Sequence, residues 1–275
     1  MITLLQFLIK LHENSRRLDR KTDHYINDLN EKNIHDVRTS VRRFNAAVSA
    51  LPRKYREEPM LLEYCKVANR LFKLNSEIRD SDIFLAKLEK FAPSQQRKIV
   101  IDTLKQTRQA KLEDAKNIAQ TLKDLNSNMI NGIGVTENEL QKRYNKILSK
   151  LISKIDNGFP IVLTNRMKVE ELHELRKDCK KIRYMLELLD KDNKSAALLR
   201  RTLEKVQDFL GSIHDSDATI MYLRSYAPNQ EIQEVINKET KQRELQYEKF
   251  LLYSKRSLHL NPNSLLMRLK NVNNS

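Results

Sequence analysis

Two amphipathic segments with the same two-phase pattern constrain this fold most strongly. In residues 172–189, apolar side chains recur at steps of three and four, the spacing of one face of an α-helix. This apolar stripe consists of Leu172, Leu175, Cys179, Ile182, Leu186 and Leu189. When His35 is aligned with His173, the earlier segment carries the matching stripe Ile34, Val37, Val41, Phe44, Val48 and Leu51. Both segments are therefore expected to be helices that bury one face.

A cationic column follows each stripe one position later. One residue turns a helix by about 100°, so these groups stand beside the buried stripe and not on the opposite, solvated side. The later column consists of His173, Arg176, Lys180 and Arg183, and Lys177 and Lys181 widen it. The earlier column consists of His35, Arg38, Arg42 and Arg43, with Asn45 at the position of Arg183. Agreement in both phases indicates an internal duplication.

A second pair of segments supports the duplication. Residues 78–82 (Ile-Arg-Asp-Ser-Asp) align with residues 213–217 (Ile-His-Asp-Ser-Asp). Upstream in the same alignment, Lys66 matches Arg201 and Arg70 matches Lys205. Two helices in each half are therefore expected to carry cations beside their apolar stripes.

The amino-acid composition and the positions of helix-breaking residues predict an all-α protein. Only 4 Gly and 6 Pro occur among 275 residues, and alternating β-branched runs are missing. The expected helices cover residues 2–29, 34–51, 60–91, 94–127, 136–156, 166–190, 194–226 and 229–257. Asn33 is expected to cap the second helix, residues 157–160 (Asn-Gly-Phe-Pro) to end the fifth, and the chain after Asn261 to fray. Residues 131–134 (Asn-Gly-Ile-Gly) predict a joint between two four-helix bundles, 1–132 and 133–275.

Charge narrows the class of ligand. Lys and Arg number 51 against 36 acids, a net charge of +15, which favours polyanions such as nucleic acids, acidic membranes or phosphate polymers. The chain has no Trp and its aromatic residues fall mainly on the apolar stripes, which disfavours nucleic acid, since single strands usually stack on exposed rings. No run of about 18 apolar residues exists, so no membrane span is expected. Two cysteines on apolar stripes suit a reducing cytoplasm.

With these features in place, the chain resembles the CHAD domains, an α-helical family named for its histidines. The resemblance rests on the column that begins at His35, its echo from His173 to Tyr184, the Arg79-Asp80 pair and the segment from Gly211 to Asp215. It implies two bundles related by pseudo-twofold symmetry, with a basic groove between them that binds inorganic polyphosphate without catalysis, cofactor or metal. The residues expected to contact the polymer are His35, Arg38, Arg42, Arg43, Lys66, Arg70, His173, Arg176, Lys177, Lys180, Lys181, Arg183, Arg201 and Lys205.

The resemblance further implies a stand-alone cytoplasmic member that associates with polyphosphate granules or with polyphosphate-handling proteins. Two alternatives stay open on the sequence. One is a metal-dependent phosphohydrolase acting on polyphosphate or nucleotides, suggested by the His35-Asp36 and His214-Asp215 pairs. The other is an RNA-binding module. Asp80, Asp82, Asp215 and Asp217 are interpreted as partners of the cationic columns and not as metal ligands, because residues two apart point to different sides of a helix.

Overall fold

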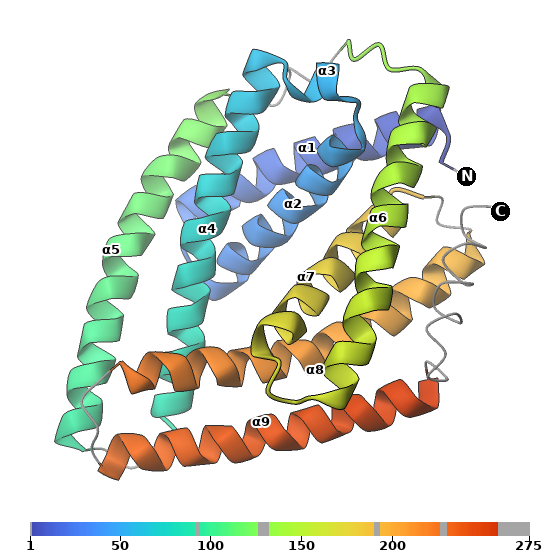
Figure 1. The fold of residues 1–275 in the computed structure, drawn as a ribbon. Coiled ribbons are helices and arrows are strands. Elements are labelled where there is room, and N and C mark those ends of the chain that lie inside the picture. Colours follow the sequence, from blue (N-terminus) through green and yellow to red (C-terminus); the bar gives the residue numbers. More distant parts are fainter. Residues whose placement is uncertain (1, 92–93, 126–131, 190–192, 226–229, 258–275) are drawn as a thin grey trace. The chain divides into compact units, whose positions relative to one another are not determined.

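The computed structural model describes residues 2–91, 94–125, 132–189, 193–225 and 230–257, and in these ranges all regular structure is helical (Figure 1). The helices are α1 (Leu4–Asn27), α2 (Glu31–Ala50), α3 (Arg53–Arg56), α4 (Pro59–Leu88), α5 (Gln95–Leu125), α6 (Glu137–Thr164), α7 (Val169–Leu186), α8 (Lys194–Arg224) and α9 (Gln230–Ser257). The predicted all-α class is confirmed. The expected ends at 127, 190 and 226, the start at 229 and the tail after Asn261 lie outside the described residues.

The chain divides into two compact units, residues 3–143 and residues 144–275 with residues 1–2. The division falls inside α6, between Arg143 and Tyr144. In the first unit, α1 packs on α2, α2 on α4, α4 on α5 and α5 on α1, which closes a four-helix arrangement. The short helix α3 occupies the stretch between α2 and α4, where the sequence predicts a loop.

In the unit of residues 144–275, α8 packs against α7 on one side and α9 on the other (Figure 1). α6 joins them through the buried hydroxyl of Tyr144, which donates to the Met185 carbonyl at 3.1 Å. Phe159 of α6 also stacks on Phe250 of α9, with ring centroids 6.2 Å apart. These contacts give the second unit its four helices.

The apolar stripes associated with α2 and α7 are buried as predicted. All six residues of each stripe form part of a core, among them Val41 and Phe44 in one unit and Cys179 and Ile182 in the other. In α1, Phe7, Leu11, Leu18 and Tyr25 are buried, whereas Leu5 is 70% exposed. Burial of one face supplies most of the stability of such helices, since short isolated helices are marginal in water.

Polar caps set several helix starts. Asn30, and not Asn33 as predicted, caps α2, because its Oδ1 accepts from the Asn33 amide at 2.8 Å. Asn33 instead donates its side-chain amide to the Asp28 carbonyl. Thr136 and Glu139 form a reciprocal capping box at the start of α6, which follows the expected glycine joint.

The predicted break at residues 157–160 is wrong, because α6 continues through it to Thr164 with Pro160 inside the helix. Proline in a helix interior removes one hydrogen bond and costs about 3 kcal/mol. Here Phe159 and Val162 on either side of it are buried. Packing of this turn offsets the local preference against helix.

Candidate anion-binding site

In the unit of residues 3–143, α2 presents its cationic column beside the buried stripe, as its phase requires. His35 is exposed, whereas Arg38, Arg42 and Arg43 are half-buried. The His35 Nε2 atom lies 3.3 Å from the Thr39 hydroxyl one turn later. The column therefore combines one accessible imidazole with three guanidinium groups whose stems lie along the helix surface.

Phe72 of α4 lies beneath two of these guanidinium groups. The Cζ atoms of Arg38 and Arg42 are 5.9 and 4.9 Å from the centroid of its ring. Cation–π contacts of this kind orient a guanidinium group while leaving its N–H donors able to bind an anion. Phe72 was missed in the sequence, although an aromatic residue directly after Leu71, which is buried, was a usable signal.

Arg79 of α4 interacts with residues at the start of α2. It forms an ion pair with Glu31, and it contributes to the electrostatic environment of His35. Although His35 is exposed overall, partial burial, and then the positive charges of Arg38, Arg42 and Arg79, lower its pKa. The structure thus gathers His35, Arg38, Arg42 and Arg79 around the α2–α4 contact.

The other two expected residues of α4 face solvent. Lys66 and Arg70 are exposed, and Lys66 lies 3.5 Å from Glu63. Between them along α4, the Asn69 Oδ1 atom accepts from the Asn45 amide of α2 at 2.7 Å.

In the unit of residues 144–275, the corresponding helices α7 and α8 bring two imidazoles into contact. The rings of His173 and His214 meet edge to face with centroids 4.4 Å apart. Burial, His214, Lys177 and Arg176 lower the pKa of His173 to about 4. Burial, Arg176, Lys180 and Lys177 lower the pKa of His214 to about 4. The sequence placed four of these five groups together but missed His214 as a site residue.

Among the remaining expected cations of α7 and α8, two lysines of α7 form ion pairs within their own helix. Lys177 lies 2.8 Å from Glu174, and Lys181 lies 3.3 Å from the buried Asp178. Arg201 and Lys205 are exposed on α8.

Arg183 is held by an ion pair that has a neutral counterpart in the other unit. Its Nη1 atom lies 3.0 Å from Glu204, and its guanidinium group lies 5.2 Å from the centroid of the Tyr184 ring. In the alignment of the two halves, Arg183 matches Asn45 and Glu204 matches Asn69, so a charged pair replaces an amide pair. Both pairs join a column helix to the next long helix, and Arg183 therefore has a structural role that the sequence did not indicate.

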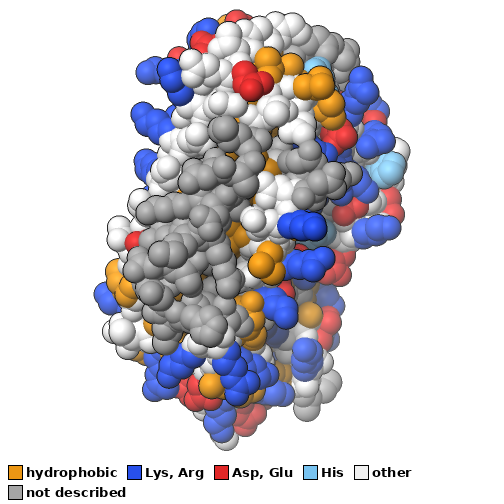
Figure 2. Space-filling view, turned by 90° about the vertical axis from the view of Figure 1, so that its right-hand side faces the viewer, with side chains coloured by type: hydrophobic (Ala, Val, Ile, Leu, Met, Phe, Trp, Pro, Cys, Tyr) orange, Lys and Arg blue, Asp and Glu red, His pale blue; other side chains and the backbone are white. Residues whose placement is uncertain are grey.

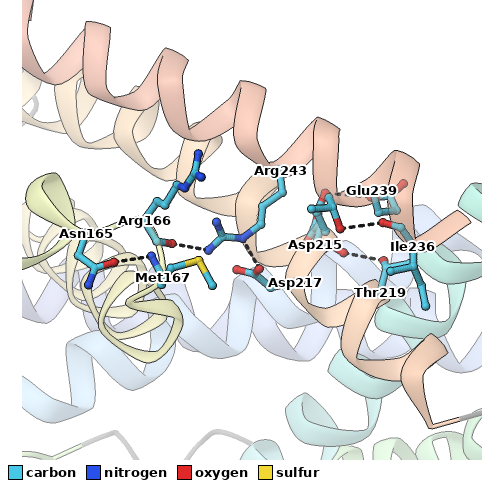
Figure 3. A network of polar contacts seen from close by, with 11 residues as sticks. Asn165, Arg166, Met167, Asp215, Asp217, Thr219, Ile236, Glu239 and Arg243 are labelled. Atoms are coloured by element: carbon cyan, nitrogen blue, oxygen red, sulfur yellow. Dashed lines mark hydrogen bonds and ion pairs between the residues drawn. The ribbon is translucent and has the colours of Figure 1, made fainter. Parts of the chain in front are cut away.

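The second Asp of each Asp-Ser-Asp motif pairs with an arginine of the following long helix and not with the columns, which corrects the sequence interpretation for Asp82 and Asp217, whereas that for Asp80 and Asp215 stays a prediction. Arg108 of α5 binds Asp82, and Arg243 of α9 binds Asp217 (Figure 3). Arg243 also donates to the Arg166 carbonyl, in the segment between α6 and α7, at 2.8 Å. These arginines therefore join α5 to α4 and α9 to α8.

Two further observations concern the surface and other ligand classes. Figure 2 shows Lys and Arg side chains spread over the drawn face, with Asp and Glu side chains between them. Within the described part of the chain, no group of three or more His, Cys, Asp or Glu side chains is placed to hold a metal ion. No described helix is long and apolar enough to cross a membrane.

Comparisons with known proteins agree with this architecture. The sequence model of the CHAD domain matches residues 10–224. The crystal structure of the CHAD domain from the plant Ricinus communis is similar, with a TM-score of 0.57 and 16% identity over 96% of this chain and 90% of that one. At this identity the similarity establishes the fold alone, and no curated protein matches the chain. Because the family match spans well over half of the sequence and confirms the resemblance carried by its histidine and arginine motifs, this chain belongs to the CHAD domain family.

Proposed function

We propose that this protein binds inorganic polyphosphate, without catalysis, through the cationic surfaces of α2–α4 and α7–α8. One observation carries the proposal: the rings of His173 and His214 are in contact beside three cations of α7. The charges of Arg176 and Lys177 lower the pKa of both rings, and that of Lys180 lowers the pKa of His214. Such a concentration of like charge is unfavourable for folding by itself. A bound polyanion would convert that repulsion into attraction.

The chemistry of the donors favours phosphate over nucleic acid. A polyphosphate chain offers only oxygens and charge, which suit guanidinium forks, ammonium groups and imidazole N–H donors. Nucleic-acid single strands also need rings on which bases stack. Two rings at these surfaces are already engaged, since Phe72 lies under Arg38 and Arg42, and Tyr184 contacts Arg183. Membership of the CHAD family, which is linked to polyphosphate binding, supports the same ligand class.

The direct test changes two cations of the α7 column that act on the histidine pair, Arg176 and Lys180. The variant Arg176→Gln with Lys180→Gln is expected to bind polyphosphate about 100-fold more weakly or worse, since hydrogen bonds to charged groups contribute about 1.5–3 kcal/mol each and the variant removes two charged groups. Its affinity should also depend less steeply on salt, by about one unit of log–log slope for each phosphate group that the variant no longer neutralises. The matched control is Lys241→Gln with Lys249→Gln, which removes the same charge from exposed positions of α9. Equal affinity of both folded variants would contradict the proposal.

Two assays address the alternatives. Release of orthophosphate from polyphosphate in the presence of Mg²⁺ or Mn²⁺ would support the phosphohydrolase and contradict binding without turnover. Competition between RNA and polyphosphate at one fixed salt concentration would support the RNA-binding module if RNA displaced the polymer at equal phosphate concentration. A cytoplasmic location, with association to polyphosphate granules or polyphosphate-handling proteins, belongs to the same proposal and can be checked by fluorescence microscopy of the tagged protein.

A further inference from the structure

The two units differ at one position that faces the histidine of the column. In the alignment of residues 78–82 with residues 213–217, Arg79 corresponds to His214. Arg79 acts on His35 in one unit, and His214 contacts His173 in the other. One unit therefore places a permanent cation at this point, whereas the other places an imidazole, whose charge depends on pH and on neighbouring charges.

We propose that polyphosphate binding by residues 144–275 is coupled to proton uptake by the His173–His214 pair, and that Arg79 makes binding by residues 3–143 less dependent on pH. The inference rests on the proposed function and concerns its regulation. It predicts that acidification raises the polyphosphate affinity of residues 144–275 more than that of residues 3–143.

The geometry of the pair explains why both imidazoles are neutral before ligand binds. Their ring centroids are 4.4 Å apart, so two charged rings would repel each other strongly. α7 adds the positive groups of Arg176, Lys177 and Lys180. Burial first, and then these positive groups, lower the pKa of each ring.

The acids on the surrounding helices do little to offset the positive charge near the two imidazoles. On α7, Glu174 is bonded to Lys177 at 2.8 Å. On α9, which packs against α8, Glu239 accepts from the Ser216 hydroxyl and Arg243 binds Asp217. Asp215 follows His214 on α8 and is half-buried.

α6 also borders the histidine pair's helix α7. The two helices meet at Gly158, where Leu175 is the nearest side chain. α6 carries one half-buried acid, Asp156, on this segment. The field at the two imidazoles is consequently set by the cations of α7, and an external anion is the group able to reverse it.

A polyanion bound beside His173, His214 and the cations of α7 shifts the protonation equilibrium of the two imidazoles. Negative charge favours the charged imidazoles and raises their pKa values, so protons are taken up on binding. By linkage, affinity rises as pH falls, by about tenfold per pH unit for each proton taken up. In the other unit His35 alone can contribute, because the guanidinium group of Arg79 stays charged at any pH near neutrality.

The experiment measures proton uptake with the full-length protein. Short-chain inorganic polyphosphate is titrated calorimetrically at about pH 6, close to the ordinary pKa of His, in two buffers of different ionisation enthalpy, which gives the number of protons bound per complex. The variants are His214→Arg, which reproduces the arrangement of the other unit, and the reciprocal Arg79→His. Terminal phosphates of the polymer also titrate near this pH, so only differences between variants on the same polymer are compared.

The expected result is that His214→Arg lowers proton uptake by about one per complex and flattens the rise in affinity between about pH 7.5 and 5.5, whereas Arg79→His increases both. If His214→Arg does not fold, His214→Gln and His173→Gln serve the same purpose, because a neutral amide cannot titrate. Unchanged uptake in folded variants that still bind polyphosphate would overturn the inference and leave the proposed function standing. Absence of polyphosphate binding by the unmodified protein at every pH would overturn the proposed function itself.

Discussion

The Nε atom of Arg108 in α5 lies 2.5 Å from the Oδ1 atom of Asp82 in α4. The same contact recurs between Arg243 of α9 and Asp217 of α8, at positions that the alignment of residues 78–82 with 213–217 makes equivalent. Each pair ties the third main helix of a unit, α4 or α8, to the helix after it, α5 or α9. An ion pair thus recurs at aligned positions, and an amide pair stands where the other unit has Arg183 and Glu204, while the internal duplication itself stays a prediction.

The arginine of the second unit is the more deeply buried, since the Arg243 side chain is 8% exposed and that of Arg108 is 26% exposed. Arg243→Met is expected to lower the free energy of unfolding by about 1–3 kcal/mol, because it leaves the half-buried Asp217 carboxylate and the Arg166 carbonyl without the donor that they share. Urea denaturation followed by circular dichroism measures this. The matched variant Arg108→Met should cost less. A double variant, Arg243→Met with Asp217→Asn, should recover part of the loss, and failure of Arg243→Met to destabilise would contradict the role assigned to this pair.

Phe72 is expected to support ligand binding without touching the ligand. Replacing it by Leu removes the ring under Arg38 and Arg42, and each such contact contributes about 0.5–1 kcal/mol at a partly exposed site. The affinity for polyphosphate should fall about fivefold, whereas Phe72→Tyr should retain it. Phe209→Leu, which removes a half-buried ring that packs on Tyr253, is the control for general loss of an aromatic side chain. Equal affinities of Phe72→Leu and Phe209→Leu would show that the ring does not orient the guanidinium groups.

The ligand-free protein should lose stability as pH falls from about 6.5 toward 4. In the unfolded chain His titrates near 6.5, whereas His173 and His214 have pKa values of about 4 in the fold. The unfolded state binds more protons throughout this interval, so acidification favours it. Carboxylates such as Asp36, whose pKa is lowered by its hydrogen bond with Lys21, lose their stabilising effect only nearer pH 4.

Chemical denaturation at about pH 7.5 and 5.5, on either side of the ordinary pKa of His, tests this expectation. The decrease in stability between the two pH values should be smaller in His214→Gln than in the unmodified protein. His24→Gln, at an exposed position of α1, should leave the decrease unchanged. Saturating polyphosphate should reverse the trend, so that the thermal stabilisation it confers is larger at the lower pH.

Gly158 lies inside the continuous helix α6, so a residue with a higher helix propensity should stabilise it. A Cβ atom added at this position would meet Leu175 at 3.9 Å, an ordinary van der Waals distance. Gly158→Ala is expected to raise the free energy of unfolding by about 0.5–1 kcal/mol. The contrasting variant is Gly132→Ala, at a backbone φ of +91° that L-residues rarely adopt, which should be destabilising. Destabilisation by Gly158→Ala would indicate that α6 bends at the position where the sequence predicted a break.

The sequence by itself determined the helical class, the buried stripes of α2 and α7, and the cations that stand beside them. These features follow from the period of one helix, and burial of one face decides them locally. The two-unit arrangement around one shared groove, and contact of all fourteen residues with a polymer, stay predictions.

Only the tertiary structure decided which groups on neighbouring helices face the columns. Phe72 meets Arg38 and Arg42, and His214 meets His173, because of how α4 and α8 are set against α2 and α7. That setting depends on packing between helices far apart in sequence, which the pattern within one segment does not encode. The same reason explains α6, where burial around Pro160 outweighs a local preference that, taken alone, ends the helix.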